Sequence, residues 1–224
     1  RDQKAIAAFL TGLKRRRCIK SHTPMDGISY GAEPTYIVVY RHPVDAHFSF
    51  RSHVDNMKDQ EMFADQFPAD IEAGFNRFLN EAATDKGTDD LTIASITHHY
   101  LQSKKRHSNG NVHFFHYADL SRDLRGQITR LADILKIELP AQMLDDISEA
   151  NTFSSMRRTA EISERRFHGN SPFKDQAKFF ESGSSNKWEG KLANESLGKY
   201  ESRCASLLAP EDAAWLNWGS TRSP

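Results

Sequence analysis

The sequence predicts an α/β protein, a three-layer sandwich in which helices cover both faces of a parallel sheet. Two apolar runs of strand length, 36–40 and 112–117, alternate with longer segments whose apolar residues recur at helical spacing. The run at 36–40 is apolar throughout, which is typical of a strand buried on both faces. At 224 residues the chain is long enough for a large core, and we expect a single domain over 1–224.

Spacing and turn residues define the predicted elements in order. In the first helix, Ile6, Phe9, Leu10 and Leu13 share one face. Pro43 suits the first turn of the second helix, since its missing N–H needs no partner there. We expect helices over 1–16, 43–58, 71–80, 91–104, 122–135, 141–150, 192–208 and 211–218, strands over 17–21, 36–40 and 112–117, and a turn at 109–110.

One long polar stretch separates the predicted elements near the C-terminus. The residues from 157 to 187 include Gly169, Pro172, Gly183 and four serines between 171 and 185. This composition predicts a long loop, which is typical of a functional or mobile segment. We expect it to close over a bound ligand as a lid.

Charge and cysteine content exclude several function classes. Lysine plus arginine and aspartate plus glutamate both number 30, so the formal net charge is zero. A neutral chain lacks broad attraction to nucleic acid or anionic membrane, and we expect neither as a partner. Cys18 and Cys204 lie far apart in the sequence, which fits a reducing, cytoplasmic compartment. No apolar run approaches transmembrane length, and no signal-peptide pattern opens the chain.

The ten histidines raise the question of a metal site. His113 and His116 are three positions apart on a predicted strand and therefore point to opposite faces. His98 and His99 are adjacent on a predicted helix and diverge. The chain has no H-E-x-x-H, no cysteine–histidine ligand set and no G-x-S-x-G motif. We therefore expect no metal cofactor.

The junction after the run 36–40 has the composition of a phosphate site. Arg41 follows the run directly, Pro43 opens a helix, and Ser49 lies eight positions after Arg41. A fixed cation, a hydroxyl and a helix N-terminus in one place suit a phosphate group. The alternative is an arginine that ends a strand in a salt bridge, with a small helix residue that faces the core.

Other segments carry further candidates. Lys20 and His22 end the first predicted strand, at the edge where open α/β sheets bind ligands, and can serve as a charge stabiliser and a general base. Tyr117 ends another strand, where an aromatic ring can stack on a base. Phe153 and Met156 can wall a pocket. The alternatives are a surface lysine, a hydrogen-bonded loop histidine, a core tyrosine and two loop residues that cap the core.

Taken in order, these segments resemble the PAPS-dependent sulfotransferases of the cytosolic and bacterial type, where PAPS is 3′-phosphoadenylyl sulfate. The resemblance covers almost the whole chain from about Arg17. The segment 20–24, KSHTP, resembles the family's K-T-H-x-P motif, whose lysine contacts the sulfuryl group and whose histidine is the catalytic base. The segment 41–49, RHPVDAHFS, resembles R-N-P-x-D-x-x-x-S, whose arginine and serine bind the 3′-phosphate. This second segment is the most specific of the signals.

Two segments resemble the family's adenine site. Tyr117, followed by Asp119, is similar to the Y-E-D-L/M strand end whose tyrosine lies near the adenine. Thr152, Phe153 and Met156 belong to the sequence TFSSM, which resembles the S-F-x-x-M segment that lines the adenine pocket. The resemblance therefore implies that Tyr117, Thr152, Phe153 and Met156 bind the cofactor.

The chain departs from the family at two places. Gly183 and Trp188 resemble the R-K-G-x-x-G-D-W motif, whose arginine and lysine grip the 3′-phosphate, so the resemblance implies that Gly183 belongs to the cofactor site. Glu181 and Ser182, however, stand at the two basic positions of the motif. The family also opens with a strand, a phosphosulfate-binding loop of the form Y-P-K/R-S/T-G-T-S/T and a helix. Nothing in residues 1–16 resembles that loop, so we expect the chain either to begin after it or to lack it, with little or no activity in the second case.

The resemblance implies a fold similar to nucleotide kinases and a sulfuryl transfer from PAPS to a hydroxyl or amine of a small-molecule acceptor, with PAP as product and no metal. His22 would remove the acceptor's proton, Lys20 would stabilise the developing charge, and Arg41 with Ser49 would hold the 3′-phosphate. One alternative is a P-loop phosphotransferase, which requires the G-x-x-x-x-G-K-S/T motif that this chain lacks. The other is a non-catalytic nucleotide-binding or scaffold domain that retains the fold.

Overall fold

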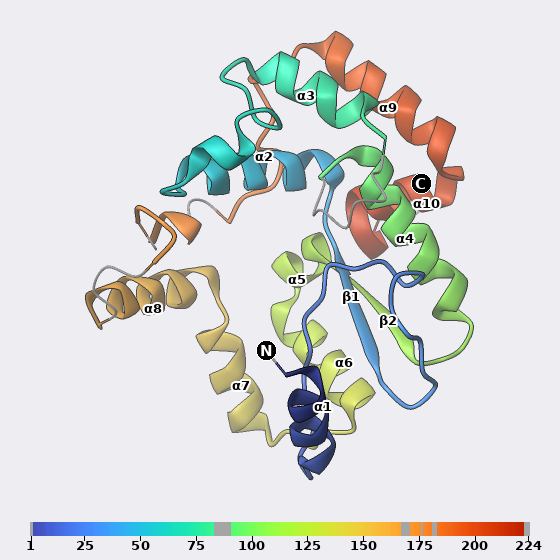
Figure 1. The fold of residues 1–224 in the computed structure, drawn as a ribbon, viewed down its shortest axis with the longest axis vertical. Helices are drawn as coiled ribbons and strands as arrows, with labels where there is room; N and C mark the ends of the chain where they lie inside the picture. The colour runs from blue at the N-terminus through green and yellow to red at the C-terminus, as the bar shows by residue number, and fades with distance from the viewer. Residues whose placement is uncertain (1, 83–90, 167–170, 176, 181–182, 222–224) are drawn as a thin grey trace.

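The computed structural model describes residues 2–82, 91–166, 171–175, 177–180 and 183–221. Ten α-helices and two strands lie in these ranges, together with three short 3₁₀ helices (Figure 1). In order they are α1 (Gln3–Gly12), β1 (Tyr36–Tyr40), α2 (Pro43–Asp55), η1 (Gln60–Phe63), α3 (Ile71–Asn80), α4 (Ile93–His107), β2 (Val112–His116), α5 (Tyr117–Arg122), α6 (Leu124–Leu135), α7 (Ala141–Ala150), α8 (Phe153–Arg166), η2 (Ala177–Phe180), α9 (Asn194–Leu207), α10 (Pro210–Trp218) and η3 (Gly219–Thr221).

The two strands pair in parallel, which confirms the predicted α/β class. Tyr36 lies opposite Val112, and Tyr40 lies opposite His116. Because parallel strands need a crossover connection, the chain between them passes through α2, α3 and α4. The carboxyl ends of both strands therefore meet at one edge, where α2 and α5 begin (Figure 1).

Helices lie on both faces of these strands, as the three-layer prediction requires. On one face the ring of Phe114 packs against Tyr100 of α4 and Trp215 of α10, with centroids 5.9 and 5.6 Å away. On the other face Arg130 of α6 lies 4.4 Å from the ring of Phe115 and donates to the Phe114 carbonyl. Val39 is nevertheless 59% exposed, so β1 is not buried on both faces along its whole length.

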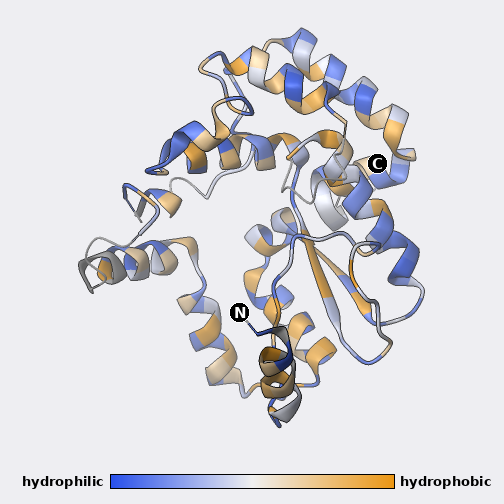
Figure 2. Ribbon diagram, viewed as in Figure 1, coloured by the Kyte–Doolittle hydropathy of each residue, from blue (hydrophilic) through white to orange (hydrophobic). Residues whose placement is uncertain are grey.

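Two apolar clusters form the core. The first joins α2, α3, α4 and α9, and the second joins both strands to α4 and α10. The two strands are among the hydrophobic segments at the centre of Figure 2. Within the described ranges, no helix is both long and apolar enough to cross a membrane.

Three predictions of local structure are wrong. Residues 17–21 do not form a strand. In the described part of the chain β1 and β2 pair only with each other, so neither strand gives 17–21 a partner. The predicted loop from 157 is helical as far as Arg166, because glycine and proline appear only beyond that point. The predicted helix 122–135 is divided at Asp123, whose Oδ1 accepts the N–H of Gly126 at 2.8 Å and caps α6.

Candidate functional site

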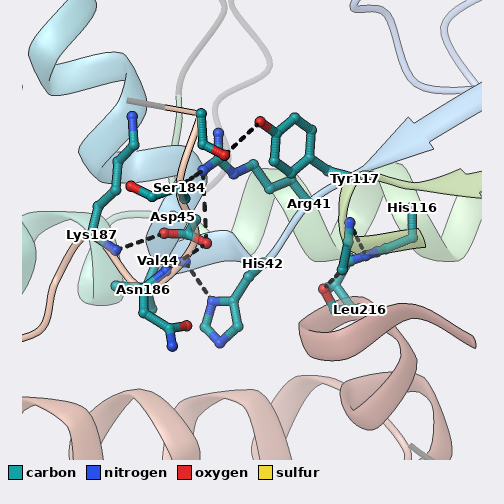
Figure 3. Close-up of polar contacts among 12 residues, drawn as sticks. Arg41, His42, Val44, Asp45, His116, Tyr117, Ser184, Asn186, Lys187 and Leu216 are labelled. Carbon is teal, nitrogen blue, oxygen red and sulfur yellow. Dashed lines mark hydrogen bonds and ion pairs between the residues drawn. The ribbon is translucent and has the colours of Figure 1, made fainter. Parts of the chain in front are cut away.

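The junction of β1 and α2 is built by local capping. His42 precedes the first turn of α2, and its Nδ1 accepts the N–H of Val44 at 3.2 Å (Figure 3). Its ring is buried against Trp188 and Trp218, with centroids 4.4 and 5.0 Å away. Burial, assisted by the charges of His116 and Arg41, lowers the pKa of His42 to about 3. The ring is therefore neutral near pH 7 and can accept the hydrogen bond that starts the helix.

Arg41 lies at the carboxyl end of β1, with 18% of its side chain exposed. Its Nη2 donates to the Ser184 carbonyl at 2.9 Å, and its guanidinium carbon lies 4.3 Å from the centroid of the Tyr117 ring. The Tyr117 hydroxyl in turn donates to the Gly183 carbonyl at 3.3 Å. The ends of both strands are thus joined to the start of the segment 183–188 (Figure 3).

Asp45 holds the other side of this segment. Its Oδ1 accepts the N–H of Lys187 at 3.0 Å, and its Oδ2 accepts the N–H of Asn186 at 3.2 Å. The same Oδ2 lies 3.8 Å from Arg41 Nη2. No motif in the sequence indicates these contacts, which join α2 to a segment about 140 positions away.

Gly183 brings the start of α8 into the same place. Its φ is +60°, a conformation that glycine adopts without the strain of a side chain. A Cβ at this position would lie 2.7 Å from the ring of Phe153, so that ring packs directly on the glycine. The structure therefore brings together four of the predicted cofactor residues from distant segments: Arg41, Tyr117, Phe153 and Gly183.

The three remaining cofactor candidates lie on α2 or at the start of α8. The Thr152 hydroxyl donates to the Glu149 carbonyl at 2.9 Å and accepts the N–H of Ser155 at 3.3 Å, which supports the first turn of α8. Met156 is half-buried one turn after Thr152. Ser49 is half-buried on α2, one turn after Asp45 and therefore on the same face of the helix.

The predicted catalytic residues lie in a separate, exposed segment. Lys20 and His22 are both exposed, and they do not end a strand as predicted. Burial lowers the pKa of His99 on α4, and the charges of His98 and then His22 lower it further, which places His22 near α4. His99 Nδ1 lies 2.7 Å from the hydroxyl of Tyr40, the last residue of β1. Within the ranges that the structure describes, no three His, Cys, Asp or Glu side chains form a group that could hold a metal ion.

Comparisons with known proteins point to one family. The family model for the sulfotransferase domain matches residues 4–211. A glycolipid sulfotransferase of Mycobacterium bovis is 29% identical over an alignment that covers 98% of this chain and 75% of that protein. A glycolipid sulfotransferase of Mycobacterium tuberculosis is also 29% identical, over 98% of this chain and 74% of its own length.

Solved structures show the same fold at low sequence identity. A mouse sulfotransferase complexed with PAP gives a TM-score of 0.72 at 17% identity, over 93% of this chain and 72% of its own. A retinol dehydratase in complex with androsterone and PAP gives a TM-score of 0.67 at 18% identity, over 91% of this chain and 57% of its own. The match to the family model over most of the chain shows that this protein belongs to the sulfotransferase family.

Proposed function

We propose that this protein transfers a sulfuryl group from PAPS to a hydroxyl or amine of a small-molecule acceptor. The observation that carries this proposal is the meeting of Arg41, Tyr117, Phe153 and Gly183 at the carboxyl edge of the strands. PAPS supplies the activated sulfuryl group when it is bound, and its 3′-phosphate and adenine are the parts that a cation and aromatic rings can recognise.

The donor set fits the 3′-phosphate. Arg41 Nε is buried, and no hydrogen-bond partner for it exists in the described ranges. An unpaired buried donor is costly in isolation, and a phosphate oxygen would satisfy it. The N-terminus of α2 follows Arg41 directly and adds a positive dipole. Arg41 would hold the 3′-phosphate together with the Ser49 hydroxyl.

The adenine would lie against the aromatic side chains. Tyr117, Phe153 and Met156 supply ring faces and a thioether, which suit a flat heterocycle. Thr152 and the backbone at Gly183 would complete this wall; Thr152 caps the turn that starts α8, and Gly183 packs on the Phe153 ring. At the other end of the cofactor, His22 would take the acceptor's proton and Lys20 would stabilise the charge that develops on the transferring group.

The acceptor that we propose is a hydroxyl on a glycolipid or another largely apolar molecule. The curated relatives are glycolipid sulfotransferases. In this chain the ring of His53, on the last turn of α2, lies 4.7 Å from Phe173 and 5.0 Å from Phe179, which is 53% exposed. An exposed aromatic surface of this kind suits an apolar ligand. Phe67, another aromatic residue near α2, is only 8% exposed and belongs to the core, so it is not part of this surface.

The Arg41→Ala variant tests the phosphate site. We expect its affinity for PAP to fall by about 1.5–3 kcal/mol, because one charge-assisted contact is lost. Isothermal calorimetry with PAP measures this change, and adenosine 5′-phosphate, which has no 3′-phosphate, should bind both proteins equally. Arg125→Ala is the matched control, since Arg125 forms an exposed ion pair with Asp145. Equal affinities of the parent protein and Arg41→Ala for PAP would place the 3′-phosphate site elsewhere.

Thermal unfolding tests whether the protein binds PAP or ATP. We expect PAP at about 100-fold its Kd to stabilise the protein by roughly 2.7 kcal/mol, whereas ATP at the same concentration should not raise the Tm. A rise in Tm with ATP alone would favour a phosphotransferase. No rise with PAP in the complete gene product would favour a scaffold that retains the fold.

A further inference from the structure

Asp45 is a buried carboxylate whose contacts all lead toward the proposed phosphate site. Asp45 is 2% exposed. Its carboxylate accepts the N–H groups of Lys187 and Asn186 and forms an ion pair with Arg41 Nη2 (Figure 3). A buried carboxylate is costly unless it is paired and hydrogen-bonded. Here two of the partners are backbone groups of the segment that also binds Arg41 and Tyr117.

These contacts restrain both the Arg41 side chain and the backbone at Asn186. Arg41 Nη2 lies 3.8 Å from the Asp45 carboxylate on α2 and 2.9 Å from the Ser184 carbonyl. Asn186 has a φ of +62°, in the left-handed region that glycine adopts freely and that asparagine adopts more readily than most residues, though at some cost. Such a conformation persists only where surrounding contacts determine it, and the bond from the Asn186 N–H to Asp45 is one of them.

We propose that Asp45 is a positioning residue for the phosphate site, and the functional half of this inference rests on the proposed function. Asp45 orients the Arg41 guanidinium and holds the backbone of 183–187 over it, without contacting the ligand. The carboxylate therefore determines both the orientation of the Arg41 guanidinium and the position of the backbone that faces it. Loss of the carboxylate should loosen 183–187 and weaken PAP binding together.

The chain offers a matched control in Asp119. This aspartate is 5% exposed and accepts the backbone N–H of Ser220 at 3.1 Å and its hydroxyl at 2.8 Å, and it pairs with Arg122 at 3.0 Å. Asp119 lies shortly after the carboxyl end of β2, as Asp45 lies shortly after the carboxyl end of β1. Its bonds, however, go to Ser220 in the 3₁₀ helix η3 and not to the segment 183–188. Asp119→Asn should therefore lower the Tm like Asp45→Asn and leave PAP affinity unchanged.

Hydrogen exchange and PAP titration together test the proposal. In Asp45→Asn, which keeps the shape of the side chain and removes its charge, we expect the amides of 183–188 to exchange faster and PAP affinity to fall about tenfold. Asp119→Asn should show neither change. Unchanged exchange at 183–188 in Asp45→Asn would overturn the proposal, whether or not the parent protein binds PAP.

The two proposals fail in different ways. If Asp45→Asn exchanges faster at 183–188 but binds PAP as the parent does, while Arg41→Ala loses affinity, then the site exists and the positioning role is wrong. If the parent protein does not bind PAP, the proposed function is wrong, and faster exchange at 183–188 still supports the structural half of the inference.

Discussion

The His22→Ala variant is expected to lose sulfuryl-transfer turnover by roughly 10²- to 10⁴-fold, the usual contribution of a general base. Its affinity for PAP should stay close to that of the parent protein, because the proposed phosphate and adenine contacts come from other segments: Arg41, Tyr117, Phe153 and Gly183. A large loss of turnover with unchanged binding is the signature of a group that acts on the acceptor's proton.

Initial rates of sulfuryl transfer from PAPS in the complete gene product measure the first quantity, and calorimetry with PAP measures the second. His98→Ala is the matched control. His98 lies on α4 next to His99, the residue whose pKa His22 also affects, and its Nε2 is 2.9 Å from Asp26 Oδ2 at the surface. We expect this variant to turn over at the parent rate. Parent-like turnover by His22→Ala would remove His22 from the catalytic role.

Local patterns in the sequence were sufficient for most of the fold. The helices predicted over 71–80 and 141–150 are α3 and α7 at their observed bounds, Ile71–Asn80 and Ala141–Ala150. Two apolar runs predicted the parallel strands. The strand at 17–21 failed because a strand depends on a partner that its own residues do not specify. The loop from 157 failed because polar composition is shared by loops and by exposed helices.

The site was predictable where it depends on side-chain identity. The family resemblance indicated Arg41, Tyr117, Phe153 and Gly183, and the structure brings these four together. The contacts of Asp45 could not be predicted, because its partners at 186 and 187 are backbone N–H groups. Every residue except proline has such a group, so the sequence carries no signal for which of them a carboxylate will bind.

The core contains a histidine with no polar role in the described structure, and its replacement should stabilise the protein. His47 is 1% exposed and is surrounded by the rings of Phe67, Phe75 and Phe78, with centroids 5.4, 5.7 and 4.8 Å away. Neither ring nitrogen has a hydrogen-bond partner within the described ranges. An unsatisfied buried donor costs about 1–3 kcal/mol, so we expect His47→Leu to raise the free energy of unfolding near pH 7.5 by an amount in this range.

The same residue should make the protein acid-sensitive. Burial, assisted by the charge of Arg51, lowers the pKa of His47 from 6.5 to about 4. Between these two values the unfolded chain binds a proton that the folded chain does not, so the free energy of unfolding falls as the pH falls. From about pH 7.5 to about pH 5, this one residue contributes a loss of about 2 kcal/mol. His47→Leu should therefore lose less stability over that interval than the parent protein.

Urea unfolding of both proteins at about pH 7.5 and about pH 5 measures these effects, and His42→Leu separates their two causes. The pKa of His42 is also lowered, to about 3, but its Nδ1 accepts the Val44 N–H that starts α2. His42→Leu should show the same weaker acid sensitivity and yet be less stable than the parent near pH 7.5, because the cap is lost. If His47→Leu is also less stable near pH 7.5, the His47 ring makes a polar contact that stabilises the fold, and the stabilising prediction is wrong.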